Sequence, residues 1–344
     1  FGAVHKKFSG GRIMAYTTID NPELYFQTKL YVGNGSTNAI TLDGSENMQP
    51  DWTWIKNFET DHANVLVDAV RGVTKELRSN GTNAEITTSN SFTSFDSDGF
   101  TLGADSTDSY NKNSNNFVSW NWKESATAGF DIVSYTGNGS NRTISHSLSG
   151  TPELMLMKRR DSSAGWIIYI KDVGAGKYLR LNTSDAEASD TNIFNNTDPT
   201  ASVFSVGTDT DNNGNSSTYI NYLFKPVQGY SAFGKYFGNG DASNSTYIHL
   251  GFRPAFFFLK KISASGEDWR ICDNKRDLAN VVDRTSKPNL AAADADADVM
   301  DFCSNGVKLR SSDGGVNGSG STYIYIAFAE SPFVNSNGVP NNAR

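Results

Sequence analysis

Four histidines and a scattered set of carboxylates are the groups of this chain that could transfer protons. The histidines are His5, His62, His146 and His249. A general acid or base needs a partner group fixed within hydrogen-bond reach, and the sequence shows no recognisable constellation of this kind. We therefore assign the histidines structural or surface roles, and we expect no catalytic residue and no enzymatic activity.

One run of carboxylates has a spacing that could bind a cation. Asp294, Asp296 and Asp298 alternate with alanines, so an extended backbone would place all three on one face. Ca²⁺ takes several oxygen ligands, which makes this run a candidate calcium site. The run lacks the glycine and the spacing of known calcium loops, and a solvated loop is the alternative that we favour. No other cofactor is expected.

Two pairs of tryptophans could bind a ligand by stacking. Trp52 and Trp54 are two residues apart, as are Trp120 and Trp122, so each pair shares one face of a strand. Exposed pairs of this kind form the stacking platforms of sugar-binding β-sandwiches, whereas buried pairs fill a core. Core packing is the alternative that we favour, and the four residues remain a candidate ligand site.

Composition excludes several classes of function. The net charge is −7, and no basic stretch contains interleaved aromatic residues, so we expect no nucleic-acid binding. No apolar run approaches the ~18 residues of a membrane helix, so we expect no membrane insertion. The two cysteines, Cys272 and Cys303, are too few for a disulfide framework, and we favour two free thiols over a disulfide.

Short β-strands must position these residues, because turn-forming residues are abundant and the apolar runs are short. One set of markers occurs three times. The pattern Tyr-x-Gly-Asn-Gly begins at Tyr31, Tyr135 and Tyr236, with its first glycines 104 and 101 residues apart. An apolar run ends at a lysine in each copy, at intervals of 102 and 102 residues; these lysines are Lys56, Lys158 and Lys260. Such self-similarity indicates a repeat architecture.

Two further markers recur in the same order. An apolar run is followed by an aspartate in each copy, which we interpret as part of the architecture; these residues are Asp68, Asp172 and Asp273. Each copy closes with a strand that alternates between an aromatic-rich face and a more polar face, and these strands begin at Phe117, Tyr219 and Tyr323. An alternation of period two predicts a strand with its aromatic face turned inward.

We therefore predict an all-β chain of three tandem β-sandwich modules of the jelly-roll or lectin-like type. The modules span residues 30–124, 130–226 and 229–333. An N-terminal arm or leader with a short helix precedes them at residues 1–29, and a C-terminal tail follows at residues 334–344. Short helices are expected around residues 20–27 and 183–188. The short junctions favour a stiff rod or a compact trefoil over freely moving modules.

Several longer strings carry a family resemblance that covers nearly the whole chain from Met14 to Phe333. They include residues 50–56, 68–72, 94–100, 229–240 and 322–333. These strings resemble tandem-module virion structural proteins of tailed bacteriophages, especially phages of marine bacteria. The resemblance implies a tail-fibre, appendage or head-surface component, made in the host cytoplasm and located in the virion. Other virion proteins and further copies of the chain are the implied partners, and no catalytic residue is implied.

Three functions follow as hypotheses. The first is a virion structural protein that assembles as an oligomer and contacts host surface glycans. The alternatives are a carbohydrate-binding adhesin of a cell surface and a polysaccharide depolymerase, which would need a pair of carboxylates at one site. Features shared by all three copies indicate scaffold, so a local function is expected where the copies differ, as at His62, the tryptophan pairs and residues 294–298.

Overall fold

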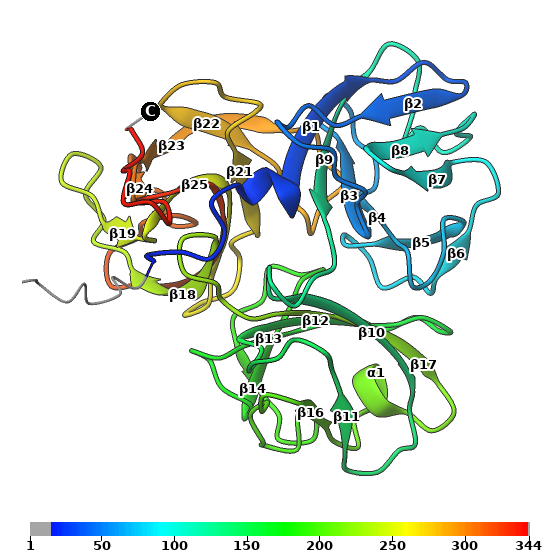
Figure 1. Ribbon diagram of the computed structural model, residues 1–344. Helices are drawn as coiled ribbons and strands as arrows, with labels where there is room; N and C mark the ends of the chain where they lie inside the picture. Colours follow the sequence, from blue (N-terminus) through cyan, green and yellow to red (C-terminus); the bar gives the residue numbers. More distant parts are fainter. Residues whose placement is uncertain (1–14, 343–344) are drawn as a thin grey trace, which may run out of the picture.

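The computed structural model describes residues 15–342, and antiparallel strands make up almost all of its regular structure (Figure 1). The strands gather in three regions of the chain, residues 26–122, 130–224 and 231–332, which we call the first, second and third repeat units. In each unit two sheets pack against each other, and in the first two units one sheet is larger than the other. The predicted all-β sandwich fold is therefore confirmed.

The first unit contains nine strands. Its large sheet has the order β1-β9-β3-β4-β5-β6, and its small sheet has the order β2-β8-β7. The strands are β1 (Phe26–Val32), β2 (Asn38–Thr41), β3 (Trp52–Asn57), β4 (Val65–Asp68), β5 (Lys75–Arg78), β6 (Ile86–Thr87), β7 (Phe92–Asp96), β8 (Gly99–Leu102) and β9 (Asn116–Trp122). Because Phe26 already pairs with Trp122, β1 begins four residues before the predicted module boundary at residue 30.

The second unit repeats this topology. Its large sheet has the order β10-β17-β12-β13-β14-β15, and its small sheet is the pair β11-β16. The strands are β10 (Phe130–Thr136), β11 (Arg142–Ser145), β12 (Leu154–Arg159), β13 (Trp166–Ile170), β14 (Lys177–Arg180), β15 (Ala188–Ser189), β16 (Val203–Val206) and β17 (Thr218–Phe224). A single helical turn, α1 (Thr210–Asn213), precedes the last of them.

The third unit keeps the same centre but enlarges its second sheet. The orders are β18-β25-β20-β21 and β19-β24-β23-β22. The strands are β18 (Ser231–Phe237), β19 (Tyr247–His249), β20 (Phe252–Lys261), β21 (Arg270–Asp273), β22 (Val282–Thr285), β23 (Ala295–Cys303), β24 (Gly306–Leu309) and β25 (Thr322–Pro332). The order β18-β25-β20-β21 thus matches the first four strands of the six-stranded sheets in the other two units. The division into independent modules stays a prediction.

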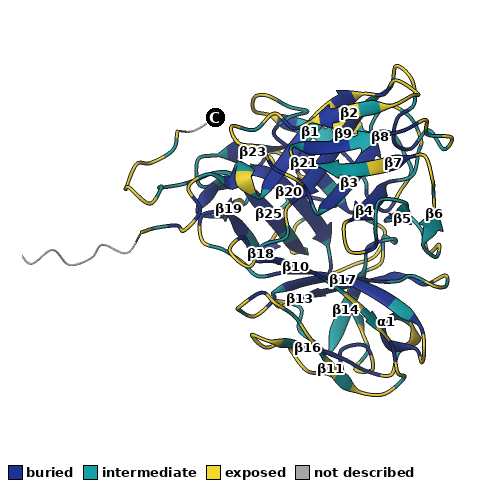
Figure 2. Ribbon diagram, turned by 45° about the vertical axis from the view of Figure 1, so that its right-hand side comes forward, coloured by how far each residue is buried: buried dark blue, intermediate teal, exposed yellow. Residues whose placement is uncertain are grey.

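The large sheets are buried on both faces. One face of each sheet packs inside its own unit, and the other faces contribute to one hydrophobic core that draws residues from all three units. On β3, for example, Trp52 and Trp54 point into the shared core while Ile55 points into the first unit. Figure 2 shows these central strands as the dark, buried interior, with exposed residues confined mainly to loops. The units are therefore fused through their cores rather than strung as separate domains.

The Gly-Asn-Gly motif forms the expected turn, and its two glycines have different roles. The second glycines, Gly35, Gly139 and Gly240, have φ near +70° (67°, 69° and 72°), where a side chain would be strained. At the first glycine, such as Gly33, an added Cβ would lie 2.2 Å from a carbonyl oxygen of the loop before the closing strand. The motif is therefore needed where that loop crosses the turn.

The two predicted helices have different outcomes. A 3₁₀ turn, η1 (Pro22–Leu24), lies within the first predicted stretch, and the Asn21 side chain caps it by accepting from the Glu23 amide at 3.1 Å. The second prediction, residues 183–188, is wrong, because residues 183–187 form no helix and Ala188 begins β15, which pairs with β14. Among residues 15–342 no helix has the length and apolar character needed to cross a membrane.

Candidate functional site

The most unusual charged groups of the chain are three fully buried lysines, Lys56, Lys158 and Lys260. They are the repeat markers that end β3, β12 and the equivalent part of β20. Each ammonium group donates to a carbonyl of a neighbouring unit, at 2.7 Å to Ala291, 3.2 Å to Thr82 and 3.3 Å to Ser184, respectively. Burial lowers the pKa of each to about 8. The amines are thus used as structural donors between units.

The three acceptors occupy equivalent places. Each lies two residues after an asparagine whose side chain accepts a backbone N–H of its own unit; these asparagines are Asn80, Asn182 and Asn289. The first unit supplies the acceptor for the second, the second for the third, and the third for the first. The three junctions therefore close a ring with approximate threefold symmetry.

Further bonds repeat at each junction. Five residues after the asparagine, the amides of Glu85, Glu187 and Asp294 donate to carbonyls of the adjoining unit at 2.8, 3.1 and 3.0 Å. The indole N–H of Trp166 donates to the Arg78 carbonyl at 2.9 Å, and that of Trp269 donates to the Arg180 carbonyl at 3.0 Å. These bonds satisfy polar groups that would be costly to bury alone.

Two of the junctions contain a buried ion pair. Asp68 pairs with Arg71, and its Oδ2 accepts from the Tyr222 hydroxyl of the second unit at 2.7 Å. Burial raises the pKa of Tyr222 well above its usual value, so the hydroxyl stays protonated and donates. At the junction of the third and first units, Asp273 pairs with Arg276 at 2.7 Å and accepts from the Trp120 indole at 3.1 Å.

The remaining junction, between the second and third units, is apolar at this place. Strand register aligns Asp68 and Asp273 with Ile170, because these residues pair with Trp52, Phe256 and Leu154, respectively. Ile170 and Val173 replace the aspartate and arginine, and Ile326 replaces the Tyr or Trp donor. The predicted marker Asp172 is therefore misaligned by two residues, and it lies exposed in the turn after β13.

The candidate tryptophans lie in the shared core. Trp52, Trp54, Trp120 and Trp122 are at most 2% exposed, and Trp52 stacks on Trp122 and Tyr222 with centroid distances of 4.5 Å. They present no face to solvent, so the structure contradicts a stacking platform and supports the core-packing alternative. Large rings suit this position because the shared core lies between one face of each of the three sheets and has to be filled by the side chains on those faces.

The two candidate calcium ligands that the structure describes, Asp294 and Asp296, do not converge. Asp294 is held by Arg276 and by the Ser286 hydroxyl, at the place that Glu85 and Glu187 occupy in the other units. Asp296 is exposed and 4.0 Å from Arg284, while the side chain of Asp298 lies outside the described part of the chain. Within residues 15–342 no group of three side chains suited to a metal is described.

The other predicted residues stand apart from one another. His62 packs near Lys56 and its carbonyl accepts from that amine at 3.0 Å, His146 contacts the Thr200 carbonyl, and His249 is exposed in β19. Cys272 and Cys303 are free thiols, the first of them fully buried. His5 and the first part of the predicted N-terminal arm or leader, residues 1–14, lie outside the described residues.

Sequence reasoning missed a carboxylate pair at the link between the first and second units. Burial and a hydrogen bond with Asp131 raise the pKa of Glu124 to about 7. The Glu124 carboxylate accepts from the Ile132 amide at 3.1 Å, and Asp131 accepts from the Ser147 amide at 2.5 Å. The only available signal was Glu124 itself, a charged residue in a very short junction.

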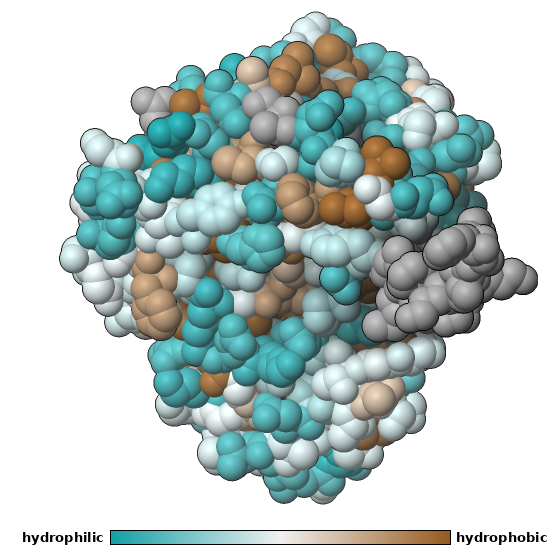
Figure 3. Space-filling model, turned by 60° about the vertical axis from the view of Figure 1, so that its left-hand side comes forward, coloured by the Kyte–Doolittle hydropathy of each residue, from teal (hydrophilic) through white to brown (hydrophobic). Residues whose placement is uncertain are grey.

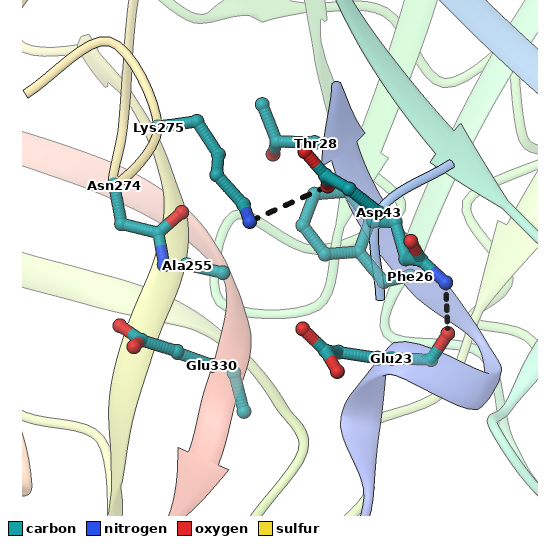
Figure 4. Close-up of a pocket in the computed structure, with 10 residues that line it drawn as sticks. Glu23, Phe26, Thr28, Asp43, Ala255, Asn274, Lys275 and Glu330 are labelled. Atoms are coloured by element: carbon teal, nitrogen blue, oxygen red, sulfur yellow. Dashed lines mark hydrogen bonds and ion pairs between the residues drawn. The ribbon is translucent and has the colours of Figure 1, made fainter. Parts of the chain in front are cut away.

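Two pockets lie where units meet. Figure 4 shows one of about 60 Å³ between β1 and the third unit, where Lys275 reaches Asp43 at 3.5 Å beside Thr28 and Glu23. It has room for a few water molecules. A larger pocket of about 250 Å³ lies at the junction of the second and third units, lined by Tyr178, Arg180 and Glu187 among others.

Comparison with known proteins assigns a family but no activity. No curated protein and no solved structure matches the chain. One family does match, over residues 21–332, and the matched region spans all three repeat units with η1 and the junctions between them. On this match the chain belongs to the family described as Domain of unknown function (DUF7483).

Proposed function

We propose that this chain is a non-catalytic structural component of a bacteriophage virion, placed in a tail fibre, an appendage or the head surface. One observation carries the proposal. Three repeat units share a single core and interlock through equivalent buried lysines, which makes one rigid block without flexible joints. A rigid block suits a particle component that must hold its shape, and the family resemblance of the sequence supports the same role.

The surface is compatible with assembly in water. The face shown in Figure 3 is largely hydrophilic, and its apolar residues form small, separate groups. Single exposed apolar side chains such as Phe237 and Leu278, at 68% and 78% exposure, occur in the third unit. We propose that copies of the chain associate with each other and with other virion proteins, and that the assembled surface contacts host glycans.

The test is the composition of the particle. Phage particles that encode this chain would be purified on a density gradient and analysed by mass spectrometry. We expect its peptides at a stoichiometry comparable to other structural proteins, and gold-labelled antibodies should locate them on the particle by electron microscopy. Detection in the infected lysate but not in purified particles would contradict the proposal.

A second candidate function is a carbohydrate-binding adhesin of a cell surface. The polar pocket at the junction of the second and third units favours it, because this is where one repeat departs from the others. Fractionation separates the two candidates: an adhesin would remain with the membrane or wall of the producing cell, whereas a virion component would leave with released particles.

A further inference from the structure

The junction between the second and third units has lost the arginines that fill its counterpart. Between the first and second units, Arg160 pairs with Glu85 at 2.8 Å, and Arg71 reaches the same carboxylate at 3.4 Å. Two residues after the repeated lysine, the third unit has Ile262 in place of Arg160, and it is buried. Val173 replaces Arg71. The carboxylate of Glu187, which is equivalent to Glu85, therefore has no arginine partner among the described residues, and it pairs with Lys177.

A pocket of about 250 Å³ lies beside this carboxylate. Its walls come from both units: Tyr178, Arg180, Asp185 and Glu187 from the second, and Ser265 from the third. The two other junctions place a buried or paired arginine beside the equivalent carboxylates, Glu85 and Asp294. The pocket is thus a local departure from a repeated interface, which is where the repeat predicts a specific function.

Ion pairs and hydrogen bonds hold the walls of the pocket in place. Arg180 is fixed by Asp211 at 2.8 Å and lies over the Tyr178 ring with its Cζ 5.4 Å from the centroid. On the opposite wall, the Ser265 hydroxyl accepts from the Ala186 amide at 2.9 Å, and the Gly266 amide donates to the Ser184 carbonyl at 3.0 Å. A pocket with fixed walls needs little reordering when a ligand binds.

The lining restricts the ligand. Asp185 and Glu187 place two carboxylates at the pocket, and the guanidinium of Arg180 is already paired with Asp211, so an anion would be repelled. The apolar part of the lining is limited to the Tyr178 ring, Ala186 and Ala188, which disfavours a large hydrophobic ligand. Carboxylates, a guanidinium and a serine hydroxyl together offer both acceptors and donors to a ligand rich in hydroxyl groups. The volume lies just below the ~300–1,000 Å³ of pockets for drug-sized molecules, which suits one sugar ring.

We infer that this pocket binds a single uncharged hexose residue, as the contact point of the chain with a surface polysaccharide. The inference deepens the proposed function, since it names the substrate class of the glycan contact and the residues that make it. Asp185 and Glu187 accept from the sugar hydroxyls, Arg180 donates to a ring or hydroxyl oxygen, and the Tyr178 side chain forms the more apolar wall.

The test uses the full chain and defined probes. Saturation-transfer NMR would be run with the methyl α-glycosides of glucose, galactose and mannose, and with spermidine as a cationic probe. We expect transfer to at least one glycoside, and binding weaker by at least about tenfold in the double variant Asp185→Asn/Glu187→Gln, because neutral acceptors make weaker hydrogen bonds than charged ones. The matched control is Glu46→Gln, an exposed carboxylate of the first unit, which should bind as the wild type does.

A second variant gives the Glu187 carboxylate an arginine partner without removing a polar group of the pocket. Ile262→Arg restores the side chain that the first junction has at this place, and it should abolish glycoside binding while circular dichroism shows an unchanged fold. The inference is overturned if no glycoside binds, if binding survives in the double variant, or if spermidine alone binds. The particle test is independent of these outcomes. If the chain is found in virions but binds no hexose, only this inference is refuted. If the chain binds a hexose but is absent from virions, only the proposed function is refuted.

Discussion

Buried charge is the feature that most distinguishes individual residues of this chain. Lys56, Lys158 and Lys260 satisfy their ammonium groups with carbonyl oxygens, but burial still disfavours the charge, as their pKa values near 8 show. An exposed lysine has a pKa near 10.5. Between these two values the unfolded chain binds more protons than the folded chain, so the free energy of unfolding must rise with pH.

We therefore expect the chain to gain stability as the pH rises through about 8 to about 9, by up to ~1.4 kcal/mol per pH unit for each lysine. Cys272 acts in the opposite direction above its unfolded value of 9.0, because burial raises its folded pKa to about 12. Urea denaturation across this pH range measures the slope. The variant Lys158→Met should reduce that slope by about a third, and a flat or falling curve for the wild type would refute the account.

The effect of Glu124 on the free energy of unfolding has the opposite pH dependence. Burial and the neighbouring Asp131 raise its folded pKa to about 7, above its unfolded value of 4.5, so its contribution to stability is full below about pH 4.5 and is lost as the pH rises through 7. Glu124→Gln keeps an acceptor for the Ile132 amide without the charge. We expect it to stabilise the chain at pH ~8 by about 1 kcal/mol, discounted for solvent screening at this half-buried site, and to have no effect at pH ~4. Thermal melts of the variant and the wild type at the two pH values measure this difference in stability, with Glu46→Gln as the control.

At the scale of elements, the three junctions solve one packing problem in two ways. At two junctions the contact between the units is made by an aspartate, an arginine and an aromatic hydrogen-bond donor. At the third junction the equivalent side chains are Ile170, Val173 and Ile326. Because these sets occupy equivalent places, the chain itself shows that a complete apolar set can replace a complete polar one. Removing one partner alone leaves a buried charge uncompensated, which is far more costly.

This contrast predicts strong non-additivity. Asp68→Ile should destabilise the chain by about 3–5 kcal/mol, because Arg71 stays buried without its closest carboxylate. The triple variant Asp68→Ile/Arg71→Val/Tyr222→Ile imports the apolar set, and its loss should be less than about 2 kcal/mol. Chemical denaturation of both variants measures the difference. If the triple variant were as unstable as the single one, the two sets would not be interchangeable.

The sequence predicted the strands better than the faces they bury. Period-two alternation in the closing strands correctly placed aromatic residues on one inward face, and the turns at Gly-Asn-Gly followed from residue type. On β3, however, both faces are buried, so no polar side marks which neighbour each residue meets. Asp172 was misaligned because the second unit has Ile170 at the aligned place, and its nearest aspartate follows two residues later. The small pocket by Glu187 is lined by residues of two units, which no single motif records.

At the scale of the whole molecule, the shared core decides how the chain unfolds. The core cluster contains residues of all three units, among them Trp52, Tyr222 and Phe328, so unfolding one unit would expose the apolar faces of the other two sheets. Separate modules joined by linkers would instead lose structure one at a time. The ring of equivalent junctions adds to the coupling, because opening one unit breaks two of the three.

We therefore expect calorimetry to show one unfolding transition, with equal calorimetric and van't Hoff enthalpies, despite a length that usually implies several domains. Deleting the third unit, residues 229–344, should give a chain that aggregates or binds hydrophobic dyes, since its β20 and β25 no longer cover the tryptophans of the first unit. The control is the variant Glu46→Gln at an exposed site of the first unit, which should leave the single transition in place. Two or three separate transitions in the full chain would show that the units are energetically independent, and the rigid block on which the proposed role rests would then not exist.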